Sequence, residues 1–189
     1  MNLKNIQIRE TIASDFNYIM EVEKLTFGSD KEAKLVAELL ADNTAEPTIS
    51  LLAFCKEKPV GHILFTRVYF SEQEGQPMMH ILAPLAVKPE YQRQGIGGML
   101  INAGIKKLRE KGSNIVFVLG HKEYYPKYGF MLDANQIGYP APYPIPEEYS
   151  DYWMVQPISP KGFEIGKGKI KCCDELNKLE HWRDDESDR

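Results

Sequence analysis

Residues 84–98, Pro-Leu-Ala-Val-Lys-Pro-Glu-Tyr-Gln-Arg-Gln-Gly-Ile-Gly-Gly, decide the fold of this chain. An apolar extended run ends at residues 88–89, a short polar link follows, and three glycines open an amphipathic helix. The first N–H groups of a helix lack intrahelical partners and carry a partial positive charge, so they attract anions. Because Gly95, Gly97 and Gly98 have no side chains, a bulky phosphate can approach these N–H groups closely. The stretch therefore predicts a pyrophosphate site at the end of a strand.

Two common phosphate-binding patterns do not fit these glycines. A P-loop needs a lysine and a hydroxyl residue after its last glycine, but Gly98 is followed by Met99 and Leu100. The dinucleotide pattern Gly-x-Gly-x-x-Gly needs a third glycine where Leu100 stands. The missing lysine and hydroxyl argue against a nucleotide-phosphate binder built on the same glycines.

The spacing Gln92-x-x-Gly95-x-Gly97 resembles the Gln/Arg-x-x-Gly-x-Gly/Ala signature of the GCN5-related N-acetyltransferases, the GNAT family. In that family the signature holds the pyrophosphate of acetyl-coenzyme A. Further elements resemble the family in the expected order: a third strand, a fourth strand with its turn, a Tyr-x-x-x-Gly-Phe element and the ending of one bacterial subgroup, found here at residues 61–65, 85–92, 125–130 and 139–154. The resemblance covers roughly residues 5–158.

The resemblance implies a specific mixed α/β fold. Its central sheet is mixed and mostly antiparallel, splayed between the fourth and fifth strands and flanked by helices. We expect residues 1–160 to form one GNAT domain, and residues 161–189 to be a C-terminal extension packed on it or frayed from it, because the composition changes after Pro160. The charged end, residues 183–189, is expected to be frayed.

Periodicity and capping signals give the expected elements. Helices are predicted from Ser14, as N-cap, to Phe27 and over residues 31–41, 95–111 and 121–127, and strands over residues 6–9, 48–55, 60–69, 78–87, 115–119 and 152–158. Residues 139–146, with four prolines, are expected to form a loop. Pro84 cannot donate to a strand ladder, so it predicts a bulge or an unpaired side at the level where the family's strands splay.

Composition narrows the class of protein. The formal net charge of −4 argues against nonspecific nucleic-acid binding and suits a cationic amine substrate. No run approaches the ~20 apolar residues that cross a bilayer, and the first residues lack a signal-peptide core, so we expect a cytoplasmic protein without membrane contact. The protein is expected to be a monomer or a homodimer. Cys55 and the adjacent Cys172 and Cys173 have no zinc-site spacing, so no metal is expected.

The resemblance implies acetyl-CoA as co-substrate and assigns the residues that bind it. The backbone of Val87 would pair with the pantetheine amides, and N–H groups across residues 93–98 would hold the pyrophosphate. The full set expected at the cofactor is Leu85, Ala86, Val87, Gln92, Arg93, Gln94, Gly95, Ile96, Gly97, Gly98, His121 and Tyr125.

Tyr125 is the candidate general acid. It stands four residues before Gly129, where the family commonly places a tyrosine that protonates the coenzyme A thiolate. A positioned proton donor contributes ~10²–10⁴-fold to a rate. The alternative is that Tyr125, like Tyr124 and Tyr128, is a packing ring of a short helix.

The general base stays open. Glu23 falls in the middle of the apolar stripe of its helix, which marks a functional carboxylate or one that pairs with a cation or reaches water. His80 lies four residues before Pro84 on the same strand face and would border the acceptor site, although a single histidine is more often structural. Ordered water serves instead in many members of the family.

The expected function is acetyl transfer from acetyl-CoA to a primary amine by direct attack in a ternary complex. Neither motif contains a cysteine, so an acyl-enzyme has no obvious nucleophile. The alternative is a coenzyme A-binding regulatory or partner-binding module without catalysis. The acceptor stays open, and residues 20–45, 71–77 and 139–152 are expected to line its site.

Overall fold

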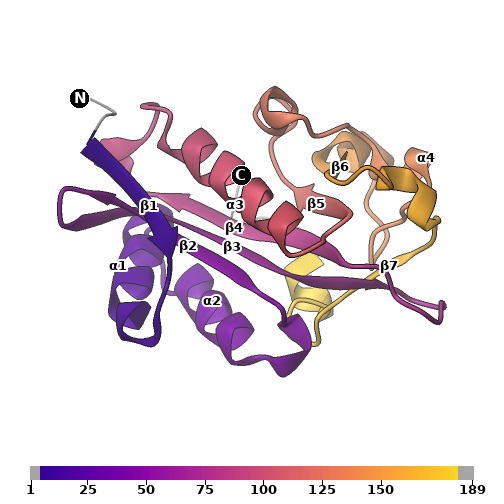
Figure 1. Cartoon of the computed structure of the whole chain (residues 1–189), viewed down its shortest axis with the longest axis horizontal. Coiled ribbons are helices and arrows are strands. Elements are labelled where there is room, and N and C mark those ends of the chain that lie inside the picture. The colour runs from indigo at the N-terminus through magenta and orange to yellow at the C-terminus, as the bar shows by residue number, and fades with distance from the viewer. Residues whose placement is uncertain (1–4, 183–189) are drawn as a thin grey trace.

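The computed structural model describes residues 5–182 (Figure 1). Its strands are β1 (Ile6–Glu10), β2 (Ile49–Cys55), β3 (Lys58–Phe70), β4 (Met79–Val87), β5 (Ile115–Leu119), β6 (Trp153–Pro157) and β7 (Ile170–Cys172). Its α-helices are α1 (Phe16–Phe27), α2 (Lys31–Ala41), α3 (Ile96–Glu110) and the short α4 (Ala134–Ile137). The 3-10 turns that matter below are η3 (Asn43–Ala45), η5 (Tyr125–Tyr128) and η8 (Leu179–Trp182).

All seven strands form one sheet, in the order β1-β2-β3-β4-β5-β6, and β7 pairs with β3 beyond the end of β2. The pair β4–β5 is parallel, and every other pair is antiparallel. This confirms the expected mixed, mostly antiparallel sheet of the GNAT fold. The chain after residue 160 adds its own strand to this sheet.

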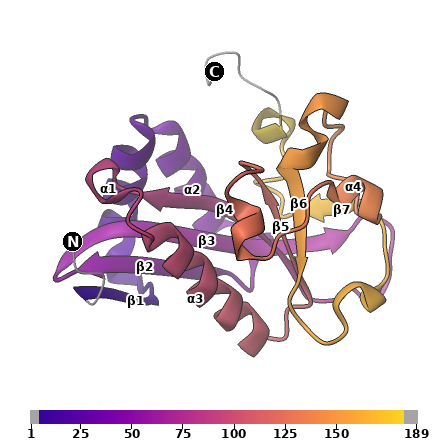
Figure 2. The same ribbon diagram turned by 90° about the horizontal axis from the view of Figure 1, so that it is seen from above.

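Helices cover both faces of the sheet. α1 and α2 lie on one face and α3 crosses the other (Figures 1 and 2). Two apolar cores follow from this arrangement: one under α1 and α2, which also contains Cys172, Cys173 and Leu176, and one under α3. β3 is buried along almost its whole length, which explains its nearly continuous apolar sequence.

The pairing of β4 with β5 ends early. The ladder runs from Met79 opposite Ile115 to Leu82 opposite Val118, and β4 then continues to Val87 beside β3 alone. The register of β3 against β4 is also interrupted opposite Pro84. Pro84 predicted a bulge or an unpaired side, and the structure has a register shift as well as an unpaired side at this point. A proline here costs no ladder bond to β5.

The expected start of α1 is wrong in one respect. Ser14 does not cap the helix, because residues 13–15 form a 3-10 turn. Asp15 instead accepts the backbone N–H of Ile12 at 2.8 Å, and its carboxylate pairs with Arg9 of β1 at 2.6 Å. Asp15 therefore holds the 3-10 turn before α1 and ties it to β1 through Arg9.

Most of the remaining elements follow the sequence closely. The helix predicted over residues 121–127 is wrong, because only the 3-10 turn η5 forms there, around a proline at position 126. Residues 139–146 contain no helix or strand, as expected of a proline-rich loop. Residues 174–182 form turns and the 3-10 turn η8, and the segment predicted to fray, residues 183–189, lies outside the described residues. Among residues 5–182 no helix is both long enough and apolar enough to cross a bilayer.

Candidate active site

A cleft of about 850 Å³ opens where β4 and β5 part. Its walls come from four places: the end of α1, the last residues of β4 with the following turn, the N-terminus of α3, and the segment between β5 and η5. The lining residues are Thr26, Phe27, Leu85, Val87, Tyr91, Gln92, Arg93, Gly95, Ile96, Gly97, His121, Glu123, Tyr124, Tyr125, Lys127 and Tyr128. The structure thus brings together the two motifs that the sequence singled out.

One rim of this cleft is the N-terminus of α3. Gly95 precedes the helix with φ +86°, and no side chain caps the first N–H groups, so they remain available to a ligand. Arg93 lines the cleft beside them, and Lys127 adds a second cation from η5. The donor set therefore fits an anion such as a pyrophosphate.

Gln92 of the signature and the neighbouring Gln94 both form hydrogen bonds within the turn before α3. The side chain of Gln92 donates to the carbonyl oxygen of Val87 at 2.9 Å, and that of Gln94 donates to the carbonyl oxygen of Glu90 at 3.0 Å. Gln94, Ala86 and Gly98 do not line the cleft, although the sequence grouped them with the cofactor residues. Ala86 is fully buried in the core under α1 and α2, because alternate residues of a strand point to opposite faces.

Gly97 and Gly98 make room for tyrosine hydroxyls. A Cβ at Gly97 would collide with the hydroxyl of Tyr124, and one at Gly98 would lie 2.5 Å from the hydroxyl of Tyr128. The ring centroids of these tyrosines are 5.2 Å apart. Burial and a hydrogen bond with Tyr128 raise the pKa of Tyr124, so the Tyr124 hydroxyl stays protonated at neutral pH. The close approach of α3 to Tyr124 and Tyr128 therefore requires glycine at both positions.

Tyr125 reaches the cleft from a packed position. It is 8% exposed, its ring lies edge-on to Phe130 at 5.6 Å between centroids, and it fills the space that a side chain at Gly120 would need. Within residues 5–182 its hydroxyl makes no hydrogen bond to another protein group and is not sealed from the cleft. Burial raises the pKa of Tyr125 to about 12, so it is a neutral donor throughout the physiological range.

Glu23 lies inside the protein rather than at the cleft. Its carboxylate and the imidazole of His62 are both fully buried and 2.5 Å apart, and the other ring nitrogen of His62 lies 3.0 Å from the hydroxyl of Ser50. Burial raises the pKa of Glu23, and the hydrogen bond from His62 opposes that shift. The inward position predicted for Glu23 is confirmed, and its partner proves to be a histidine of β3 that joins α1 to the sheet.

His80 does not join the cleft, which corrects the expectation that it borders the acceptor. It is fully buried, with Nδ1 2.9 Å from the hydroxyl of Ser113 and Nε2 2.8 Å from the carbonyl oxygen of Pro47. Burial lowers the pKa of His80 to about 4. A histidine whose two nitrogens are both engaged and which resists protonation is a structural group.

The sequence missed several residues that line the cleft. Thr26 and Phe27 enter from the end of α1, and Tyr124 and Lys127 from the segment already chosen for Tyr125. The double tyrosine next to Tyr125 was the available signal. The contribution of α1 depends on how the helix crosses β4, which no local pattern specifies.

Comparison with known proteins agrees with this geometry. Residues 16–130 match the model of the acetyltransferase (GNAT) family. The chain is 51% identical over 174 residues to an uncharacterised N-acetyltransferase, YjhQ, of Escherichia coli K12, covering 92% of this chain and 96% of that one. It is 34% identical over 130 residues to the N-acetyltransferase YhbS of the same strain, covering 68% of this chain and 75% of YhbS. The chain therefore belongs to the GNAT family of acetyltransferases.

Solved structures show the same fold with ligands bound. The crystal structure of E. coli YhbS in complex with CoA superposes with a TM-score of 0.81 at 26% identity, covering 93% of each chain. A GNAT acetyltransferase of Brucella melitensis in complex with acetyl-CoA superposes with a TM-score of 0.70 at 25% identity, covering 90% of this chain and 97% of that one.

Proposed function

We propose that this protein transfers an acetyl group from acetyl-CoA to a primary amine by direct attack in a ternary complex. The observation that carries the proposal is the cleft itself: an uncapped helix N-terminus and a phenol with a free hydroxyl face the same space beside an unpaired strand edge. The CoA and acetyl-CoA complexes of related structures support the choice of ligand.

Binding would use backbone groups first. The N–H groups at the start of α3 would hold the pyrophosphate, with Arg93 and Lys127 supplying positive charge. Leu85–Val87 pair with β3 on one side only. On the other side the Gln92 side chain donates to the carbonyl oxygen of Val87, and the remaining backbone groups of that edge would be available to the pantetheine amides, as to a neighbouring strand. His121 lies at the same opening, after the end of β5.

The chemistry requires one proton donor at the leaving sulfur. The neutral amine nitrogen forms a bond to the thioester carbon and then releases one proton to water, the carbon–sulfur bond breaks, and the sulfur leaves as a thiolate that is neutralised by a proton. We assign Tyr125 to this thiolate, because its hydroxyl has no acceptor within residues 5–182 and stays protonated. None of the cysteines at positions 55, 172 and 173 lines the cleft, which supports direct attack over an acyl-enzyme.

In this proposal, solvent water accepts the proton of the incoming ammonium group. The Glu23 carboxylate is buried against the ring of His62, and both ring nitrogens of His80 form hydrogen bonds inside the protein. Neither side chain would therefore contact a substrate in the cleft. The amine would lose its proton to water before attack.

Release of coenzyme A from acetyl-CoA in the presence of a pool of primary amines tests the function. We expect amine-dependent release, and acetyl-CoA should raise the melting temperature while ATP does not, since only a ligand of the folded state stabilises it. Stabilisation by acetyl-CoA without turnover of any amine would favour the alternative, a coenzyme A-binding module without catalysis.

A further inference from the structure

Lys88 is a buried cation at the point where β4 ends and the turn toward α3 begins. The residue is 6% exposed, although lysine is among the residues that are least often buried. The proposed reaction does not use Lys88, because its side chain does not line the cleft. A buried ammonium group is costly unless it is paired, so the contacts of Lys88 show which elements it holds together.

Lys88 contacts three different elements. Its backbone N–H donates to the carbonyl oxygen of Val60 in β3 at 3.0 Å, and its own carbonyl oxygen accepts the N–H of Tyr91 at 2.8 Å. Its ammonium group lies 2.5 Å from the carboxylate of Glu21 in α1. One residue therefore connects the sheet, the turn before α3 and α1.

These connections join separate walls of the cleft. α1 contributes Thr26 and Phe27 from its last turn, and β4 contributes Leu85 and Val87 directly before Lys88. The turn that follows Lys88 leads to the free N–H groups at the start of α3. The pair of Lys88 with Glu21 thus ties the α1 wall to the strand edge and to the turn that would bind acetyl-CoA.

The two partners of this pair are not equally buried. Within residues 5–182 the ammonium group of Lys88 has one partner, the Glu21 carboxylate, although it can donate three hydrogen bonds. The side chain of Lys88 is 7% exposed and that of Glu21 is 48% exposed. Loss of Lys88 leaves a carboxylate that water can solvate, whereas loss of Glu21 leaves an unpaired buried ammonium group. Replacement of Lys88 by an apolar side chain therefore removes the tie without creating a buried charge.

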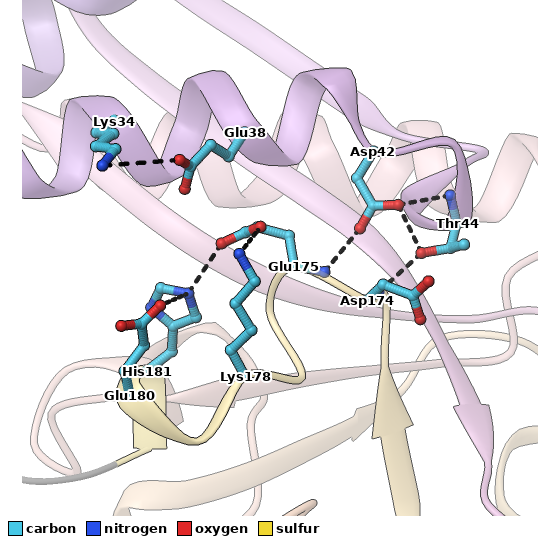
Figure 3. Close-up of polar contacts among 9 residues, drawn as sticks. All are labelled: Lys34, Glu38, Asp42, Thr44, Asp174, Glu175, Lys178, Glu180 and His181. Atoms are coloured by element: carbon cyan, nitrogen blue, oxygen red, sulfur yellow. Dashed lines mark hydrogen bonds and ion pairs between the residues drawn. The ribbon is translucent and has the colours of Figure 1, made fainter.

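The other polar contacts of the α1–α2 layer do not replace this tie. Glu23 and His62 join the middle of α1 to β3 inside the core. Figure 3 shows that residues 173–182 fix the end of α2 and η3, far along the chain from the last turn of α1. Within residues 5–182 the Lys88–Glu21 pair alone, among hydrogen bonds and ion pairs, joins α1 to residues 88–95.

We propose that Lys88 is a positioning residue for acetyl-CoA. Through Glu21 it holds α1 against the end of β4, so that Thr26 and Phe27 stay in place at the cleft. Without the pair these side chains would have to be ordered when the ligand binds, and that ordering weakens affinity. The inference rests on the proposed acetyl transfer and concerns the binding of its co-substrate.

The test is the Kd of acetyl-CoA, measured by calorimetry in Lys88→Met, which keeps an unbranched apolar stem and removes the charge. We expect the Kd to rise about fivefold or more, with a melting temperature and a binding stoichiometry close to wild type. A merely structural role would instead lower the stoichiometry through unfolded molecules and leave the Kd of the folded ones unchanged.

Lys107→Met is the matched control. Lys107 forms an ion pair with Glu10 at 2.9 Å, which joins α3 to β1, and neither residue lines the cleft. The Kd of acetyl-CoA should therefore stay within about twofold of wild type in this variant, because the change removes an ion pair without touching a wall of the site.

Glu21→Gln tests whether the pair acts as a unit. This variant should raise the Kd in the same direction. The double variant Lys88→Met/Glu21→Gln should bind acetyl-CoA within about twofold of Lys88→Met, because either change removes the same interaction.

Three results would overturn the inference: an unchanged Kd in folded Lys88→Met, an equal loss of affinity in Lys107→Met, or additive effects in the double variant. If Lys88→Met does not fold, Glu21→Gln replaces it with the same expected direction. The Kd measurement needs no turnover. If acetyl-CoA binds but no amine is acetylated, the proposed function fails, and the comparison of Kd values still decides on Lys88.

Discussion

Replacing Tyr125 by Phe removes one oxygen and keeps the ring, so it isolates the role of the hydroxyl. The ring is held by Phe130, Tyr124 and the bare backbone of Gly120, and all of these contacts survive the change. The hydroxyl makes no hydrogen bond within residues 5–182, so no protein group loses a partner. We expect the melting temperature to stay within a few degrees of wild type.

The magnitude follows from the pKa of about 12 that burial gives to Tyr125. A thiol has a pKa of about 8.5, so complete transfer of the phenol proton to the thiolate is uphill by about 3.5 pKa units, or ~5 kcal/mol. The hydroxyl therefore acts mainly as a hydrogen-bond donor to a charged sulfur. Such a bond contributes ~1.5–3 kcal/mol, which corresponds to a roughly 10- to 150-fold loss of kcat in Tyr125→Phe.

Single-turnover acetyl transfer is the appropriate assay, because slow product release would mask a change in the chemical step. The Kd of acetyl-CoA should change less than about fivefold, since a lost neutral hydrogen bond is worth ~1 kcal/mol or less here. The rate should show no basic limb from Tyr125 below about pH 11, because the donor form persists up to its pKa. Tyr128→Phe is the control and should stay within twofold. A Tyr125→Phe rate equal to that of the control would refute the assignment.

Three further changes test the surroundings of the site. Gly98→Ala should weaken acetyl-CoA binding at least tenfold by calorimetry, because the new Cβ would lie 2.5–2.7 Å from three atoms of Tyr128 and displace it; wild-type affinity would contradict this. Glu23→Gln should leave kcat/KM within about threefold in steady-state assays, because Glu23 is sealed with His62, whereas a loss of tenfold or more would restore Glu23 as a base. The buried His80 has a folded pKa of about 4 against 6.5 unfolded, so the unfolded chain binds more protons between these values and stability falls as pH falls below 6.5. Urea unfolding should show His80 costing ~2 kcal/mol at pH 5 relative to pH 7, and a His80→Asn variant with the same pH slope would contradict the depressed pKa.

The sequence was informative wherever function depends on local backbone chemistry. The glycines at positions 95, 97 and 98 predicted a helix start with free N–H groups, and Pro84 predicted the irregularity in β4. Both predictions follow from the backbone properties of glycine and proline. The position of Glu23 on the inner face of α1 also followed from helical periodicity.

Hydrogen-bond partners that lie far apart in the sequence could not be predicted. Glu23 meets His62, 39 residues away, and His80 meets the carbonyl oxygen of Pro47, 33 residues away, so no spacing rule connects them. An inward histidine in an apolar strand was a signal that Glu23 had a buried partner, because buried charges need one. The role of residues 173–182 was equally hidden, since their hydrogen bonds to Asp42 and Thr44 reach back to η3 and its N-cap.

The irregularity of β4 explains why the cleft lies where it does. A strand in the middle of a sheet normally has both backbone edges paired, and an unpaired edge buried away from water is costly. Beyond Leu82, β4 pairs with β3 alone, so the edge at residues 83–87 needs other partners. The Gln92 side chain satisfies the carbonyl oxygen of Val87, and the rest falls to solvent or to a ligand. Pro84 lacks an N–H and reduces that demand by one donor. The parting of β4 from β5 therefore opens the cleft beside backbone groups that are not paired with another strand, which is the arrangement that an extended ligand would need.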